Sequence, residues 1–403
     1  MTANSTPRDT TGLLTDPYPT CAALREEGPV HRITGPDGNP AWLVTRYEDV
    51  RRALADPRLS LDKSNGLPGN YRGFSLPPAL DANLLNMDPP DHTRVRRLVV
   101  KAFTAGRVEA MRAPVRRLAD GLLDAMESVG RADLIADYAG PLPIAVICDL
   151  LGVPHSDRQD FLAWSDALIT PDPNRPEQAK EAIGSMLRFY TGLIAAKREE
   201  PGDDLLSAVI AVRDDGEGGP GGTDRLSEDE LTSLAFLLLF AGYENVVHLI
   251  GNSVSGLLDR PELLRALREK PDGIPAVIEE FARYDGSSPL SIRRFPLEDI
   301  EIGGVTVPAG ETVLLSIASA NRDPRHFEEP DHFNPHVVRS GHLAFGHGIH
   351  YCLGAPLARM EVEVALEALL SRFPGVRLDV SKEELRWRPS IRARGLISLP
   401  IAW

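Results

Sequence analysis

The sequence is poor in cysteine and has no excess of positive charge. Its three cysteines, Cys21, Cys148 and Cys352, lie far apart without paired spacing. A disulfide framework is therefore not expected, and a reducing compartment such as the cytoplasm is favoured. Lysine and arginine number 44 against 58 acidic residues, which gives a formal net charge of −14. Because non-specific nucleic-acid binding needs a basic surface that neutralises phosphates, we expect no nucleic-acid partner.

Long apolar runs are also missing. The longest, Leu234–Gly242, is about half the length that crosses a bilayer. The N-terminal segment 1–15 is polar, lacks the apolar core of a signal peptide and is predicted to be disordered. We therefore expect no membrane association. The remaining composition, 42% hydrophobic and 25% charged over 403 residues, is typical of a globular protein of two domains or one large helical unit.

Apolar spacing predicts a mainly α fold with a small β region in the C-terminal half. Ser227 is followed three residues later by Glu230, the pattern of a capping box, and an apolar helix is expected from there to about Leu258. A further helix is expected at Pro275–Tyr284. In Glu301–Val307, a Gly-Gly pair between β-branched residues predicts a hairpin.

Cys352 stands at the end of the loop Phe345-Gly-His-Gly-Ile-His-Tyr-Cys-Leu-Gly354, before a predicted helix. The free N–H groups at a helix start favour a thiolate, which makes this cysteine a candidate metal ligand. An ordinary buried cysteine is an alternative reading. A zinc site that combines Cys352 with His342, His347 and His350 is another, although their spacing matches none of the usual paired patterns.

The five positions Phe345, Gly348, His350, Cys352 and Gly354 resemble the haem-binding signature of the cytochrome P450 superfamily. The resemblance extends from about Asp16 to the C-terminus and is closest to soluble actinobacterial members of natural-product pathways, of the macrolide and polyketide kind. It implies a single catalytic domain over 1–403 with the cytochrome P450 fold, a triangular prism of helices around haem b. It also implies that the Cys352 thiolate is the axial iron ligand, and that Phe345, Gly346 and His350 adjoin the haem.

Other segments carry the same resemblance. In Met87–Leu98, His92 and Arg96 match residues that bind haem propionates, and their i, i+4 spacing places both on one helical face. Arg294 matches another propionate-binding arginine, although its neighbour Arg293 leaves the assignment open. Glu280 and Arg283 match the family's Glu-x-x-Arg pair, to which we assign a structural role.

Two departures from the family pattern stand out. The central helix commonly carries an acid followed by a threonine that relay protons to the oxygen-binding side of the haem, but here Ala241-Gly242-Tyr243 precede Glu244 and Asn245. An amide cannot pass a proton as a hydroxyl does, so we expect altered proton delivery, in which ordered water or a substrate hydroxyl replaces the threonine. The alternative is that Asn245 is a neutral packing residue. The second departure is Val337, where the family commonly has an arginine that Arg339 could replace.

The resemblance implies a monooxygenase that inserts one oxygen atom from O₂ into an apolar natural product by hydroxylation or epoxidation. Electrons are expected from NAD(P)H through a ferredoxin and its reductase, and the acidic ferredoxin could dock on a basic patch made by Arg96, Arg97, Lys101 and Arg107. By family position, the substrate pocket is expected to include Leu85, Phe240, Leu290, Ile292 and Leu396. Oxidative coupling and a haem-free helper protein with the same fold are the alternatives.

Overall fold

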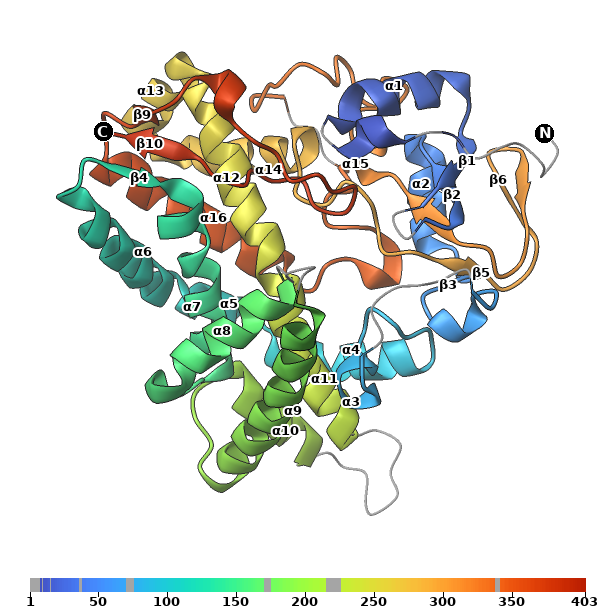
Figure 1. Ribbon diagram of the computed structural model, residues 1–403, viewed down its shortest axis with the longest axis horizontal. Helices are drawn as coiled ribbons and strands as arrows, with labels where there is room; N and C mark the ends of the chain where they lie inside the picture. The colour runs from blue at the N-terminus through green and yellow to red at the C-terminus, as the bar shows by residue number, and fades with distance from the viewer. Residues whose placement is uncertain are drawn as a thin grey trace. The chain divides into compact units, whose positions relative to one another are not determined.

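The computed structural model describes residues 8, 10–14, 16–35, 38–69, 76–169, 175–214, 226–337 and 341–403. The chain forms two compact units. The first unit comprises Met1–Gly73, Asp120–Ala139 and Asn245–Trp403, and the second comprises Phe74–Ala119 and Gly140–Glu244. Helices predominate in both units (Figure 1). The single catalytic domain expected from the sequence stays a prediction.

The first unit contains all the described strands, in four small sheets. Strand β2 (Pro40–Val44) pairs antiparallel with β1 (Val30–Thr34) and parallel with β8 (Val313–Leu315). Near the C-terminus, β10 (Pro400–Ala402) lies between β4 (Arg131–Asp133) and β9 (Arg377–Leu378), which it pairs antiparallel (Figure 1). The two-stranded sheets are β3 (Leu59–Ser60) with β5 (Phe295–Pro296), and β6 (Ile300–Ile302) with β7 (Val305–Val307).

The hairpin of β6 and β7 confirms the sequence prediction. Gly303 and Gly304 connect the strands with φ angles of 56° and 79°. Such positive φ values are unfavourable for residues with a Cβ, so the Gly-Gly pair is what permits the tight turn.

The first unit also contains helices, one of which packs on the sheet of β1, β2 and β8. Residues Val50, Leu54, Val313 and Leu315 share an apolar core, which fixes α2 (Tyr47–Ala55) to β8. The other α-helices are α1 (Pro17–Glu27), α12 (Glu244–Leu258, from Asn245 on), α13 (Pro261–Glu269), α14 (Ile274–Tyr284), α15 (Ile317–Ala320) and α16 (Ala355–Arg372). Shorter turns are the 3-10 segments Thr11–Leu14, Lys63–Asn65, Pro271–Gly273, Gly348–His350 and Lys382–Glu384, and the π-helical Ile135–Ala139.

Two outcomes concern predicted elements of this unit. The helix expected at Pro275–Tyr284 is confirmed as α14. The expected disorder of segment 1–15 is wrong for Thr11–Leu14, because these residues form a helical turn and Leu13 is buried in an apolar cluster. Burial of the Leu13 side chain contributes to the order of this turn.

In its described part, the second unit consists of helices and connecting loops, without strands. Its α-helices are α3 (Pro78–Asp81), α4 (Asp91–Ala102), α5 (Ala105–Ala110), α7 (Pro141–Leu151), α8 (Arg158–Ile169), α9 (Pro176–Glu199), α10 (Leu205–Asp214) and α11 (Glu228–Gly242), with a 3-10 turn at His155–Asp157. Aromatic packing joins α8 to α9: the Phe161 ring centroid lies 5.4 Å from that of Phe189 and 6.2 Å from that of Tyr190. Helix α6 (Arg112–Glu127) passes from the second unit into the first.

The long apolar helix predicted from Ser227 to about Leu258 is present but interrupted. At its start, the Ser227 hydroxyl accepts the Glu230 N–H, and the Glu230 carboxylate accepts the Ser227 N–H, so the predicted capping box is confirmed. The helix bends at Tyr243, directly after Gly242, which separates α11 from α12. Among the described residues, Glu228–Leu258 is the one helix long and apolar enough to cross a membrane, and 61% of its most apolar window is buried, as in the core helix of a globular protein.

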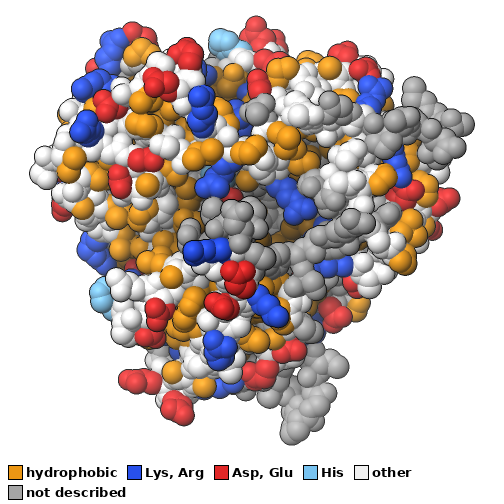
Figure 2. Space-filling model, viewed as in Figure 1, with side chains coloured by type: hydrophobic (Ala, Val, Ile, Leu, Met, Phe, Trp, Pro, Cys, Tyr) orange, Lys and Arg blue, Asp and Glu red, His pale blue; other side chains and the backbone are white. Residues whose placement is uncertain are grey.

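Charge is distributed rather than concentrated on the face that Figure 2 shows. Acidic and basic side chains alternate there with apolar ones. A net charge of −14 is thus compatible with local basic areas.

Candidate functional site

Cys352 is the accessible cysteine of the three. It lies in the loop that leads into α16, and its N–H donates to the carbonyl oxygen of Phe345 at 2.8 Å. Cys21 and Cys148 are buried, whereas Cys352 is exposed. Burial raises the pKa of the Cys21 thiol and raises that of Cys148 to about 11, so both favour the neutral form. Only Cys352 therefore presents its sulfur to a ligand outside the protein core.

Two glycines allow the backbone conformation of this loop. Gly346 and Gly348 have φ angles of 77° and 74°, in the region that favours glycine. A Cβ at Gly348 would also lie 3.1 Å from the Cα of Ala55 and 3.2 Å from the carbonyl oxygen of Leu54. The loop therefore packs closely on the end of α2, and a larger residue at position 348 would displace it.

An ion-pair network holds the residues on either side of Cys352. Arg359 on α16 donates to both carboxylate oxygens of Glu279, at 2.6 and 2.9 Å, and to the Tyr351 hydroxyl at 3.2 Å. Its guanidinium carbon also lies 4.3 Å from the centre of the Phe345 ring. His342 donates to Glu279 at 3.1 Å. Phe345 and Tyr351, before and next to Cys352, are thus tied to α14 and α16.

Electrostatics favour the ionised form of Glu279. Burial alone would raise the pKa of this carboxyl, but hydrogen bonds from His342 and Arg359 outweigh it and hold the pKa at about 2. Residues 341–403 are all described, and no three His, Cys, Asp or Glu side chains in the described part of the chain gather as metal ligands. His342, one member of the zinc alternative, instead belongs to the network of Glu279.

The predicted pair of Glu280 and Arg283 is an ion pair within the first unit. The Arg283 side chain is 0% exposed, and its Nε and Nη2 donate to the two carboxylate oxygens of Glu280, each at 2.8 Å. The carboxylate also accepts the backbone N–H of Asn334 at 2.9 Å. Val337 is exposed and Arg339 lies outside the described residues. Among the described residues, the Glu280 carboxylate is therefore held by the Arg283 guanidinium and one backbone N–H.

The cationic residues predicted to bind carboxylates lie in both units. In the first, Arg294 is buried, its backbone pairs with that of Val313, and its Nη1 donates to the carbonyl oxygen of Leu59 at 3.3 Å. In the second, His92 is buried on α4 and Arg96 is half-buried one turn later. Burial, and then the positive charge of Arg96, lower the pKa of His92 to about 4. A neutral imidazole with an N–H donor beside a guanidinium suits an anionic carboxylate.

The residues predicted to serve the oxygen-binding side flank the break between α11 and α12. Ala241 is exposed, and Gly242 and Glu244 are half-buried; they end the second unit, together with Phe240. Asn245 is exposed and is the first residue of the segment Asn245–Trp403 of the first unit. Its amide oxygen accepts a hydrogen bond from Ser288, a residue that no sequence motif singled out.

The predicted substrate-pocket residues differ in accessibility. Phe240 is 48% exposed, and Leu85 and Ile292 are half-buried. Leu290 belongs to an apolar core cluster of the first unit, and Leu396 is completely buried. By family position the segments 65–85 and 168–176 are also expected to contact substrate, and of these the parts 70–75 and 170–174 lie outside the described residues.

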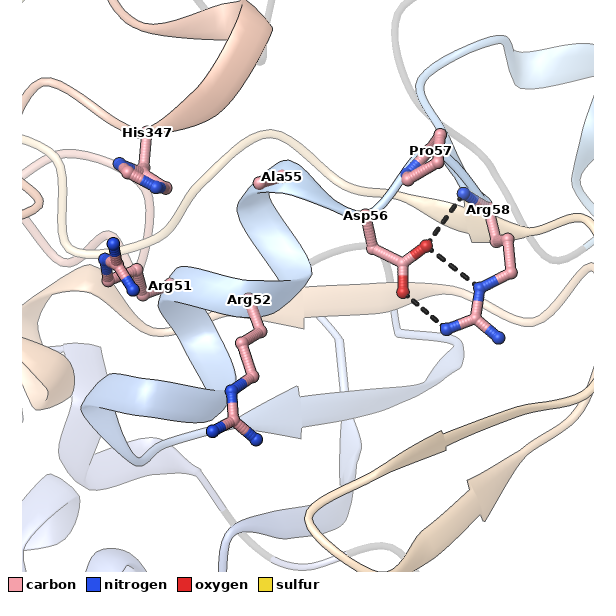
Figure 3. Close-up of a pocket in the computed structure, with 7 residues that line it drawn as sticks. All are labelled: Arg51, Arg52, Ala55, Asp56, Pro57, Arg58 and His347. Carbon is pink, nitrogen blue, oxygen red and sulfur yellow. Dashed lines mark hydrogen bonds and ion pairs between the residues drawn. The ribbon is translucent and has the colours of Figure 1, made fainter.

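A basic pocket that sequence reasoning missed lies beside the loop of Cys352 (Figure 3). It has a volume of about 500 Å³ and is lined by Arg51, Arg52, Ala55, Asp56, Pro57, Arg58 and His347. Asp56 is paired with Arg58 at 2.7 Å, whereas no ion pair within the drawn set joins Arg51, Arg52 or His347 (Figure 3). Arg51 and Arg52 are consecutive on α2, a pattern too common on solvated helices to have indicated a pocket.

These residues fit a haem. An exposed thiol on a loop held by two positive-φ glycines can offer its sulfur to iron, and within the first unit the buried guanidinium of Arg294 suits a porphyrin propionate. The donor set of the site thus defines a haem-thiolate protein.

The chain belongs to the cytochrome P450 family. The family model for cytochrome P450 matches residues 147–386. The cytochrome P450 monooxygenase PikC of Streptomyces venezuelae is 46% identical, over 96% of this chain and 91% of its own. The mycinamicin IV hydroxylase/epoxidase of Micromonospora griseorubida is 44% identical over 94% of each chain. The solved structure of ligand-free P450 monooxygenase TamI is similar with a TM-score of 0.89 and 42% identity, over 99% of this chain and 94% of that one.

The protein is therefore a cytochrome P450 monooxygenase with the fold that the sequence predicted. Membership implies a haem cofactor, a redox partner and a small-molecule substrate. It also argues against the haem-free helper, since the relatives that match nearly the whole chain are monooxygenases.

Proposed function

We propose that this enzyme carries haem b ligated by the Cys352 thiolate and inserts one oxygen atom from O₂ into an apolar natural product. The observation that carries the proposal is the exposed Cys352 sulfur on a loop held from both sides, through Phe345 and Tyr351, by Arg359. A loop held in this way would keep the sulfur in one position to bind the iron, and a thiolate ligand favours O–O cleavage.

Different residues of the chain would bind the iron, bind the propionates and pack against the porphyrin. The Cys352 sulfur would bind the iron, and His92, Arg96 and Arg294 would bind the propionates by charge-assisted hydrogen bonds. Phe345, Gly346 and His350 would adjoin the porphyrin on the thiolate side. Haem supplies the oxygen activation and the oxidation, so the protein supplies ligation, orientation and control of water.

The proposed substrate is a medium-to-large apolar molecule of the polyketide or macrolide kind, and the proposed reaction is hydroxylation or epoxidation. The support is twofold: Phe240 and Ile292 offer accessible apolar surface, and one relative is named for hydroxylation and epoxidation of mycinamicin IV. A cytoplasmic location accords with the buried state of Cys21 and Cys148 as free thiols.

Two measurements test the substrate proposal. Candidate macrolides and linear polyketides are titrated into the ferric enzyme, and a binder is recognised by its low-to-high-spin absorption change. The binder is then turned over under ¹⁸O₂, and the product is expected to contain one labelled oxygen atom. A library of such compounds that produces no spin change, while a different chemical class does, would refute the substrate class.

The proposed electron donor is an acidic ferredoxin with its NAD(P)H-dependent reductase. The basic patch expected from the sequence, Arg96, Arg97, Lys101 and Arg107, lies on the second unit, and the latter three residues are exposed. The pocket of Figure 3 adds a second basic area, on the first unit, next to the loop that carries Cys352. Positive surface near the thiolate loop would attract an acidic partner and increase its association rate.

Oxidative coupling is the second candidate reaction, and Asn245 is the observation that favours it. Without a threonine hydroxyl at this position, proton delivery to the oxygen-binding side differs from the common family pattern. The ¹⁸O₂ experiment separates the reactions, since coupling yields a product without labelled oxygen.

A further inference from the structure

The hydroxyl that the central helix lacks is present on a neighbouring segment. The Ser288 hydroxyl donates to the Asn245 amide oxygen at 2.7 Å, across 43 residues of sequence. Both residues belong to the first unit. Asn245 is exposed and Ser288 half-buried, although residues 246–255 that follow on α12 are all buried. Asn245 and Ser288 therefore lie at the solvent-accessible N-terminal end of α12, whose following residues are buried.

The segment that carries Ser288 is fixed along α12. Asn252, two turns after Asn245 and on the same helical face, donates its amide to the carbonyl oxygens of Asp285 at 3.0 Å and Arg394 at 2.9 Å. Arg394 in turn donates its backbone N–H to Ser287 at 2.8 Å and its Nε to the Asp285 carboxylate at 3.1 Å. Two side chains of one helix face thus hold both ends of the short segment 285–288.

The next residue anchors the segment on its other side. The carbonyl oxygen of Pro289 accepts the N–H of Ala318 at 3.0 Å, and the N–H of Ser291 donates to Leu315 at 2.9 Å. Ser288 consequently sits between backbone positions that are both held by hydrogen bonds. Such support is what keeps a functional side chain in one place.

The chemistry of the two side chains is complementary. A serine hydroxyl donates one hydrogen bond and accepts up to two, so it can receive a proton at its oxygen while releasing its own. An amide such as that of Asn245 orients a hydroxyl but does not exchange a proton in this way. The threonine position thus holds the orienting group, and Ser288 holds the exchangeable proton.

We propose that Ser288, oriented by Asn245, is the hydroxyl that transfers protons on the oxygen-binding side of this enzyme. The Ser288 hydroxyl turns from Asn245 and passes its proton to a water molecule on the oxygen-binding side, while a proton from a second water molecule or a substrate hydroxyl arrives at the same Oγ, so Ser288 ends unchanged. No electron moves in this step. The proposal rests on the proposed function, because it requires a haem bound through Cys352.

The test uses full-length, haem-loaded protein in its reduced, carbon monoxide-bound form. Infrared spectroscopy measures the C–O stretch, which rises in frequency when a hydrogen-bond donor near the bound oxygen atom is lost. The variants are Ser288→Ala, the hydroxyl-preserving Ser288→Thr, and Ser287→Ala as the matched control one residue earlier. A Ser288→Ala/Asn245→Thr double variant returns a hydroxyl to the helix.

We expect Ser288→Ala to raise the C–O frequency and to increase the hydrogen peroxide released per NADPH consumed with a surrogate ferredoxin system. Ser288→Thr and the double variant should return both values toward wild type, and Ser287→Ala should leave them unchanged. The proposal is overturned if Ser288→Ala matches wild type, or if Ser287→Ala produces the same change. Should Ser288→Ala not fold, Asn245→Ala supplies the same readout, since it releases the orientation of Ser288.

The absorption spectrum of the same samples separates this proposal from the proposed function. The red-shifted Soret band of a thiolate-ligated carbon monoxide complex in wild type shows that haem is bound as proposed. Its presence with no effect of Ser288→Ala overturns only the role of Ser288. Its absence from wild type overturns both.

Discussion

The Glu361→Gln variant should be more stable than the wild-type protein at neutral pH. This residue lies on α16, is 2% exposed, and its Oε2 has no hydrogen-bond partner among the described residues. Burial raises the pKa of its carboxyl well above the ordinary value of 4.5. The Glu361→Gln substitution keeps the shape of the side chain and removes the group that ionises.

The sign and size of the effect follow from proton linkage. Because the folded-state pKa is raised, the contribution of Glu361 to stability is fully present below about pH 4.5 and is lost as the pH rises toward the folded-state pKa. Within that window, the free energy of unfolding falls by about 1.4 kcal/mol for each pH unit. The stability advantage of Glu361→Gln over wild type should therefore grow by about 1.4 kcal/mol per pH unit.

Urea unfolding of the haem-loaded proteins, repeated from about pH 5 to about pH 8, measures this difference. Glu363→Gln is the matched control, because it removes the same charge from a half-buried position two residues later on α16. A difference between Glu361→Gln and wild type that stays constant over this range would refute the reasoning. So would an equal slope for Glu363→Gln.

Three further predictions concern the buried ion pair of Glu280 and Arg283, the loop that carries Cys352, and the basic pocket beside this loop. Glu280→Gln leaves the completely buried Arg283 without its counter-charge and should lower the free energy of unfolding by about 3–5 kcal/mol; a loss below about 1 kcal/mol in urea unfolding would contradict a buried ion pair. Gly348→Ala forces a Cβ into positive φ and against α2, at a cost of about 1–2 kcal/mol in backbone strain alone. Its thiolate-type carbon monoxide spectrum should decay faster than that of wild type, and an equally stable spectrum would show that the loop tolerates the change. Arg51→Glu combined with Arg52→Glu should slow reduction by an acidic ferredoxin, most strongly at low salt; stopped-flow rates that match wild type at every ionic strength would remove the pocket from the docking surface.

Local features of the fold were predictable because their signals are local. The capping box of Ser227 and Glu230, the Gly303-Gly304 turn and α14 each depend on residues within a few positions of one another. The order of Thr11–Leu14 was not predictable, because it comes from the burial of Leu13 against residues of distant segments, such as Leu24 and Ile33.

In the candidate site, too, local motifs were predictable and contacts between distant residues were not. Cys352 and its glycines could be recognised from one continuous motif. The contacts that position them could not, since Glu279 and Arg359 are 80 residues apart and Asn245 and Ser288 are 43 apart. The asparagine at position 245 indicated that α12 lacks the usual threonine hydroxyl. Only the structure shows that the segment of Ser288 brings another hydroxyl to this position.

Axial ligation of the haem iron by Cys352 is the central claim, and one spectroscopic comparison tests it most directly. Reduced, carbon monoxide-bound wild-type protein and Cys148→Ala, a change at a buried cysteine, should both give the red-shifted Soret band of thiolate ligation. Cys352→Ser should bind carbon monoxide without that band. A Cys352→Ser protein that retains the band would contradict the assignment of this cysteine as the iron ligand.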